Sequence, residues 1–391
     1  GNAERSLGCA DPCLRVSGRG HDFELLALNR TGEKVLAQVT PLLDFVLDLD
    51  VSPTRATGRL PEPHAGLEER ARLCEPGPMD LLRILHGAFR PEVGAGFPPG
   101  GLFGVFAYDF IDQFERLPQG QDDPHPTPDY LFYFADHLFM VDHLHARTIF
   151  VATALGLPDS EEEYARAQEL LRRYEVAAAE SSPLADLPAP PSLSPDEAAP
   201  DLSDGEYAAV VERLKEHILA GDVFQIVPSR SFEAPVREDA LTVYRRLRAL
   251  NPSPYMFFLR MDADTLLGAS PETALKVSGG RAQIRPIAGT KPRGFVDGRF
   301  DADLDSRYEA ELKLDAKELA EHVMLVDLAR NDVARVSRAG TRRVDSLFTV
   351  EKYSHVQHMV SSVSGELREN LDPLHAYLAT MNMGTLTGAP K

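Results

Sequence analysis

The proline-rich segment from Ala177 to Pro200 constrains the fold of this chain more than any other feature. It contains six prolines and no periodic apolar pattern. Proline at this density prevents a helix or a central strand, so the segment is predicted to be an extended linker or surface loop. The expected organisation is an N-terminal region over residues 1–177, a linker over 178–203 and a second domain over 204–391.

Charge and composition exclude several classes of protein. The 391 residues include 41 Lys and Arg against 60 Asp and Glu, and the resulting net charge of −19 repels nucleic acid. No apolar run approaches the roughly 20 residues that a membrane helix needs, and no signal peptide is recognisable. Three cysteines are too few for a disulfide framework. We expect a cytoplasmic protein that binds neither nucleic acid nor membrane.

Local patterns predict strands followed by helices on both sides of the linker. Before it, a buried strand is expected in 100–110, further strands in 130–143 and 148–155, and a helix over 161–179. After it, the capping-box pair Ser203 and Glu206 opens a helix that Gly221 ends. Further strands are expected at 223–229, 254–261, 265–270 and 274–287, the last with a Gly-Gly turn at 279–280. A long acidic helix is expected from about Asp305 to Val336, followed by two shorter helices. This order indicates the α+β class.

Two carboxylates on the predicted acidic helix form a candidate metal site. Glu318 and Glu321 are three residues apart, which places both on one helical face. Paired carboxylates suit Mg²⁺, which takes oxygen ligands and keeps waters or substrate oxygens in its shell. A solvated acidic face is the competing interpretation, and spacing alone favours it.

Other candidate positions lie in short segments rich in glycine, proline or histidine. In PIAGT (286–290), Gly289 frees the backbone to approach a ligand and Thr290 offers a hydroxyl, although a simple turn explains the same pattern. Glu272 follows a predicted strand as a candidate acid or base. His355 and His358 are more typical of packed helical histidines. From these residues alone, the chain is an acidic α+β enzyme with a candidate Mg²⁺ site.

Eight segments, taken together and in order, closely resemble the chorismate-utilising enzymes, most nearly anthranilate synthase component I. The resemblance is dense over about 204–391 and looser over about 70–177. The segments are PSR (228–230), NPSPYMFF (251–258), GASPE (268–272), PIAGT (286–290), DLDSR (303–307), KELAEHVMLVDLARND (317–332), YSHVQHMV (353–360) and MNMGTLTGAPK (381–391). The resemblance implies two subdomains of antiparallel β-sheets packed face to face with helices outside.

Two positions distinguish the reactions within the family. Members that add water to chorismate carry Lys where this chain has Gln225, and a neutral amide cannot replace that base. Aminodeoxychorismate synthases typically carry a nucleophilic Lys where this chain has Ala288. The resemblance therefore implies ammonia as the attacking species, anthranilate and pyruvate as products, and a place at the first committed step of L-tryptophan biosynthesis.

The resemblance also implies roles for individual residues. Catalytic roles fall to Glu272, which protonates the leaving hydroxyl, His358, which serves the elimination of pyruvate, and Gln225. Mg²⁺ would be held by Glu321 and Glu318, directly or through water. The remaining implied residues are those that hold the substrate (Ala288, Gly289, Thr290, Thr385 and Gly388) and those of an L-tryptophan inhibitor site (Pro254, Tyr255 and Met256). The Leu-Leu-Glu-Ser half of the family's inhibitor site is not found in this sequence.

Partners and alternatives complete the expectations. A glutamine amidotransferase subunit, anthranilate synthase component II, is expected to supply ammonia within a heterotetramer. Both ends look cut, so we expect residues 1–391 alone to be poorly folded or inactive, with the C-terminal part of the catalytic domain missing. The alternatives are an aminodeoxychorismate synthase or an enzyme that stops at the amino intermediate and, from another class, a non-catalytic tryptophan- or partner-binding module.

Overall fold

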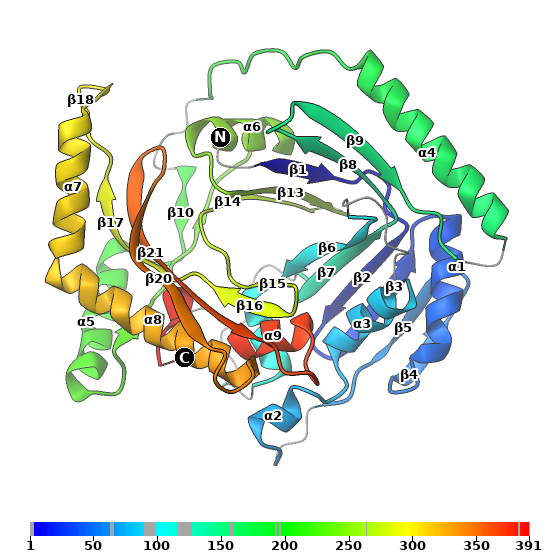
Figure 1. The fold of residues 1–391 in the computed structure, drawn as a ribbon, viewed down its shortest axis with the longest axis horizontal. Coiled ribbons are helices and arrows are strands. Elements are labelled where there is room, and N and C mark those ends of the chain that lie inside the picture. Colours follow the sequence, from blue (N-terminus) through cyan, green and yellow to red (C-terminus); the bar gives the residue numbers. More distant parts are fainter. Residues whose placement is uncertain are drawn as a thin grey trace. The chain divides into compact units, whose positions relative to one another are not determined.

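The computed structural model describes residues 4–62, 66–89, 98–115, 117, 127–156, 159–191, 194, 197–262, 264–381 and 384–390. The chain divides into two compact units, Ala3–Leu184 and Ala185–Lys391, and the division falls within the proline-rich segment. Among the described residues, no helix has the length and apolar character needed to cross a membrane. Helices and antiparallel sheets occur in both units (Figure 1), which confirms the α+β class.

The first unit is built on a six-stranded antiparallel sheet in the order β4-β5-β3-β2-β7-β6, with a smaller sheet β1-β8-β9. Apolar residues of α1 and α3 are buried where these helices pack against the larger sheet. The elements are β1 Arg5–Gly8, β2 Leu14–Arg19, β3 Asp22–Ala27, α1 Arg30–Val39, η1 Thr40–Leu42, β4 Leu47–Val51, β5 Arg55–Arg59, α2 Glu69–Arg72, α3 Pro78–Ala88, β6 Gly101–Phe106, η2 Tyr108–Gln113, β7 Tyr130–Ala135, β8 His137–Asp142, β9 Arg147–Ala152 and α4 Ser160–Glu180.

The second unit contains a five-stranded antiparallel sheet in which β15, β16, β21 and β17 lie in that order and β20 also pairs with β21. Its remaining strands form two-stranded ladders. The elements are β10 Ala199–Pro200, α5 Asp204–Ala220, β11 Gln225–Ile226, β12 Phe232–Glu233, α6 Ala240–Leu250, β13 Tyr255–Met261, β14 Asp264–Ser270, β15 Lys276–Ser278, β16 Arg281–Ile284, β17 Ile287–Pro292, β18 Phe295–Val296, β19 Arg299–Phe300, α7 Ala302–Leu314, α8 Ala316–Val336, β20 Arg343–Lys352, β21 Val356–Glu366, α9 Pro373–Thr380, α10 Gly384–Thr387 and β22 Gly388–Ala389.

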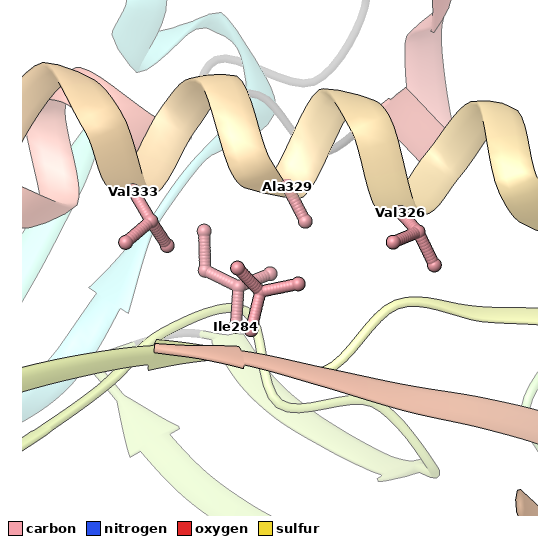
Figure 2. Packing of buried hydrophobic residues seen from close by; sticks show 5 residues of the cluster. Ile284, Val326, Ala329 and Val333 are labelled. Carbon is pink, nitrogen blue, oxygen red and sulfur yellow. The ribbon is translucent and has the colours of Figure 1, made fainter. Parts of the chain in front are cut away.

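Helix α8 is fixed against the five-stranded sheet by an apolar stripe. Val326, Ala329 and Val333 recur at helical spacing and point toward Ile284 of β16 (Figure 2), with Val363 of β21 in the same buried cluster. Burial of such side chains stabilises the packing by roughly 1.5–3 kcal/mol each for the larger ones. The stripe leaves the preceding turns of α8, which carry Glu318 and Glu321, to face β17 and β11.

Several local predictions are confirmed. Ser203 and Glu206 form the capping box of α5, and Gly221 ends that helix with φ 83°. Gly279 and Gly280, both with positive φ, form the turn between β15 and β16.

The long acidic helix was wrongly predicted as continuous. It divides into α7 and α8 because Asp315 adopts an extended conformation and caps α8, its Oδ1 accepting from the backbone N–H groups of Lys317 at 3.0 Å and Glu318 at 3.3 Å. Such a cap contributes about 1 kcal/mol to a helix.

Three further expectations were wrong. The residues beyond α8 first form the long strands β20 and β21, so His358 lies on a strand and not a helix, because sheet pairing on both sides of β21 determines this segment. Residues 177–180 are helical and not extended, because α4, which confirms the helix predicted over 161–179, continues to Glu180 and the first proline of the segment is Pro183. The strand in 100–110 is β6, a partly exposed edge strand rather than a buried one.

Candidate functional site

A bulge in β17 forms the centre of the candidate site. Ile287 pairs with Val360 and Thr290 with His358, so β17 contains one residue more than β21 between these pairs. Gly289 lies in the bulge with φ +90°, and a Cβ added there would lie 3.4 Å from Glu318 Oε2. The positive φ is the reason for glycine at this position, and the strand here lies within van der Waals distance of Glu318 on α8.

Thr290 and His358 meet directly across the ladder beside this bulge. Thr290 Oγ1 and His358 Nδ1 are 2.8 Å apart. Burial lowers the pKa of His358 from its ordinary value, and a hydrogen bond with the Gly289 backbone offsets part of that effect. His358 is therefore neutral near pH 7 and able to accept a proton.

Gln225 links Glu321, one of the two candidate metal carboxylates, to the β11–β22 strand pair. Its Nε2 donates to Glu321 Oε1 at 3.3 Å, while its Oε1 is buried and has no hydrogen-bond partner among the described residues. Gln225 is positioned by pairing with Ala389 in the β11–β22 ladder. Gly388 has φ +123°, and a Cβ there would lie 2.3 Å from the Gln225 carbonyl oxygen, so this approach requires glycine.

Glu318 and Glu321 are compatible with Mg²⁺. Both are partly buried, and Glu318 borders the β17 bulge while Glu321 borders Gln225. No cluster of three or more His, Cys, Asp or Glu side chains suited to a metal occurs in the described part of the chain. Mg²⁺ is commonly held by one or two carboxylates with waters and substrate oxygens completing its shell, so this donor set fits an open Mg²⁺ site.

The other predicted residues lie on neighbouring elements of the second unit. Glu272 follows β14 and is partly buried, with its backbone N–H donating to Ser270 Oγ at 3.3 Å. Tyr255 and Met256 begin β13, which pairs with β14, and Pro254 precedes them. The Tyr255 hydroxyl lies 2.6 Å from Thr273 Oγ1.

Two residues need separate comment. Thr385 belongs to α10, and its side chain lies outside the described part of the structure. Sequence reasoning missed His322, which is fully buried next to Glu321 and hydrogen-bonds to the carbonyl of Ala288. The only signal for it in the sequence was its position directly after Glu321.

A hollow of about 680 Å³ in the first unit involves none of the candidate residues. It lies over β2, β3 and β5. Two of its charged groups, Glu24 and Arg55, already pair with each other, and Glu24 also pairs with Arg15. The bulge, and not this hollow, therefore remains the candidate site.

Comparison with known proteins identifies the class. The chorismate binding enzyme model matches residues 75–391, and the chain belongs to that family. It is 43% identical over 392 residues to anthranilate synthase component 1 of Vibrio cholerae, covering 99% of this chain and 73% of that protein. It is also 43% identical to a pyocyanine-specific anthranilate synthase component 1 of Pseudomonas aeruginosa, covering 100% of this chain and 72% of that protein.

A solved structure supports the same fold. Anthranilate synthase component I of Streptococcus pneumoniae superposes with a TM-score of 0.77 at 26% identity, over 100% of this chain and 75% of that one. The menaquinone-specific isochorismate synthase of Escherichia coli matches in fold alone, with a TM-score of 0.56 at 14% identity.

Proposed function

We propose that this chain is the synthase component that converts chorismate and ammonia to anthranilate, pyruvate and water. The observation that carries the proposal is the contact of Gln225 with Glu321 beside the β17 bulge. It places a neutral amide next to the candidate metal carboxylates, where water-adding members of the family have lysine. The component 1 relatives support the same reaction.

The orientation of the Gln225 amide favours ammonia as the nucleophile. Its NH₂ group faces a carboxylate, so its oxygen points the other way and is buried without a partner in the described residues. That oxygen accepts an N–H of ammonia and leaves the ammonia lone pair free to attack C2 of chorismate. Water would need a base for the same attack, and an amide is not one. Ala288, with only a methyl group, supplies no competing amine.

Glu318 and Glu321 would hold Mg²⁺ at the carboxylate of the substrate. When bound, the ion stabilises negative charge that develops on that carboxylate. The support for substrate binding here is that Gly289 of the bulge approaches Glu318 Oε2 and is followed by Thr290, so the Gly289 backbone and the Thr290 hydroxyl would orient the substrate. Gly388, which lies against the Gln225 carbonyl oxygen, and Thr385 of the same C-terminal segment would hold the substrate from the other side.

Two residues transfer the protons. Glu272 protonates the C4 hydroxyl as it leaves, so that the C–N bond forms at C2 while the C4–O bond breaks and water departs. The new ammonium group then gives one proton back to the Glu272 carboxylate. Neutral His358 then removes the proton from C2, and this electron pair completes the aromatic ring as the C3–O bond breaks. The departing enolate of pyruvate takes a proton back from the protonated His358 and becomes pyruvate. Thr290 orients the His358 ring through its hydrogen bond at Nδ1.

The proposal extends to partners and regulation. An amidotransferase component II would deliver ammonia from glutamine, in a cytoplasmic heterotetramer. L-tryptophan would bind at Pro254, Tyr255 and Met256, of which Tyr255 is 46% exposed. The physical support is that β13 pairs with β14, the strand that Glu272 follows. A ligand bound at β13 can therefore shift β14 and, with it, Glu272.

Product analysis tests this function directly. The intact subunit is incubated with chorismate, Mg²⁺ and an ammonium salt, and anthranilate is measured by its fluorescence while pyruvate is measured enzymatically. We expect equal amounts of the two products, with no turnover when sodium replaces ammonium. A stable amino intermediate without pyruvate would support the alternative that stops at that stage, aminodeoxychorismate as product would support that synthase, and no turnover would support a binding module.

A further inference from the structure

His322 is a buried histidine that the proposed chemistry leaves unused. It lies on α8 directly after Glu321 and has no solvent exposure. Both ring nitrogens are nevertheless bonded, Nδ1 to the Ala288 carbonyl oxygen at 2.9 Å and Nε2 to Ser361 Oγ at 2.7 Å. A fully buried, fully bonded ring between α8 and two strands is a fixed support and not a mobile acid or base.

The direction of each bond follows from the chemistry of its partner. A carbonyl oxygen only accepts, so His322 Nδ1 carries the hydrogen that it donates to Ala288. The neutral ring then accepts at Nε2 from the Ser361 hydroxyl. Ser361 Oγ in turn accepts the backbone N–H of Phe348 at 3.1 Å. A series of three hydrogen bonds, all donating in the same direction, therefore runs from β20 through β21 and α8 to the bulge of β17.

This hydrogen-bond series connects two interruptions of the regular strand pairing, one on each side of β21. On one side Ala288 and Gly289 lie in the β17 bulge, where the regular ladder is interrupted. On the other side the register of β20 shifts between Ser346 and Thr349, and Phe348 has φ +56°, which is unusual for a bulky residue. His322 and Ser361 supply hydrogen bonds to both interruptions, so both are stabilised by side chains in addition to the strand pairing.

We propose that His322 is a positioning residue that holds the β17 bulge in its reactive shape. By fixing the Ala288 carbonyl, it places Thr290 opposite His358 and Gly289 against Glu318. His322 does not touch the substrate. This inference rests on the proposed function, because it assigns to the bulge the orientation of His358 during the release of pyruvate.

The inference predicts a change in product ratio and not only in rate. If the bulge relaxes, Thr290 no longer orients His358, and the elimination step slows more than the addition of ammonia. The amino intermediate then accumulates relative to anthranilate. A role limited to stability would lower the amount of folded enzyme and both products in proportion, leaving their ratio unchanged.

Two amide substitutions separate the two hydrogen bonds of His322. In His322→Asn the side-chain nitrogen occupies the position of Nδ1 and can still donate to Ala288. In His322→Gln the longer side chain places its amide near Nε2, where it reaches Ser361 instead. We expect His322→Gln to raise the ratio of amino intermediate to anthranilate about tenfold or more. In His322→Asn, which keeps the hydrogen bond to Ala288, we expect this ratio to stay close to the wild-type value.

Controls make the test decisive. His217→Gln replaces a half-exposed histidine at the end of α5 and is expected to keep the wild-type ratio. Thermal melts show which variants fold, and if His322→Gln does not, Ser361→Ala provides a milder lesion with a smaller shift in the same direction. An unchanged product ratio in folded His322→Gln, or in folded Ser361→Ala when His322→Gln fails to fold, would overturn the inference. Wild-type enzyme that forms neither product would instead overturn the proposed function on which it rests.

Discussion

Thr290 and His358 face each other across neighbouring strands, with Oγ1 and Nδ1 2.8 Å apart. The residues are 68 positions apart in the sequence. Their pairing exists because β17 contains one extra residue before Thr290, and Gly289 takes the positive φ that the bulge requires. The same bulge brings the strand against Glu318, so one local irregularity positions both the partner of His358 and one candidate metal carboxylate.

Removing either carboxylate of the candidate metal site should raise the Mg²⁺ requirement. For Glu318→Gln and Glu321→Gln we expect the Mg²⁺ concentration for half-maximal activity to increase about tenfold or more, because an uncharged amide is a poorer ligand for a hard cation. Asp327→Asn is the matched control, since Asp327 lies on the same helix, is exposed and pairs with Arg330. Equal Mg²⁺ requirements in all three variants would contradict the assignment.

Activity should fall as the pH is lowered, because His358 becomes protonated. Burial lowers the pKa of this ring, so its neutral, proton-accepting form predominates at pH 7 and is lost only as pH falls below the ordinary histidine value of about 6.5. We expect anthranilate formation measured against pH to decline below about 6.5. An acid limb centred at or above that value, in saturating substrate, would argue against a buried neutral base.

Asp305 should contribute to folding of the second unit. It is 3% exposed and accepts hydrogen bonds from Arg293 Nε at 2.6 Å, Gly294 N at 2.9 Å and Lys352 Nζ at 3.0 Å. The hydrogen bond from Arg293 is the main cause that holds the pKa of Asp305 well below its usual range. We expect Asp305→Asn to lower the free energy of unfolding by about 3 kcal/mol in urea titrations at pH 7.

The pH dependence of that loss has a defined sign. Because the folded-state pKa of Asp305 is depressed, its contribution is complete above the unfolded value of about 3.9 and disappears as pH falls further. The difference between Asp305→Asn and wild type should therefore shrink below about pH 4. Asp303→Asn, at a side chain 81% exposed, should change stability little at any pH. A comparable loss in both variants would contradict this account.

Local chemistry made part of the fold predictable from the sequence. The capping box of Ser203 and Glu206, the Gly221 helix end and the Gly279–Gly280 turn depend only on residues close in the chain, and all three were predicted correctly. The break at Asp315 was missed, since the helical pattern continues on both sides and the cap is visible only in the backbone. The long strands β20 and β21 were missed because their stability comes from pairing with distant strands.

The candidate site shows the same limit. Glu318 and Glu321 share a helical face by spacing alone, so their proximity was predictable. The contacts of Glu321 with Gln225, and of Thr290 with His358, join segments separated by 96 and 68 residues. Nothing in local spacing specifies such contacts, and only resemblance to a family placed these residues in one site.

The measurement that tests the central claim most directly is the product balance of His358→Met with chorismate, Mg²⁺ and ammonium. Methionine is similar in size but cannot accept the C2 proton. The account predicts that the variant still forms the amino intermediate, seen by chromatography, and releases little anthranilate or pyruvate. A normal yield of anthranilate from this variant would contradict the assignment of His358 and the mechanism built on the β17 bulge.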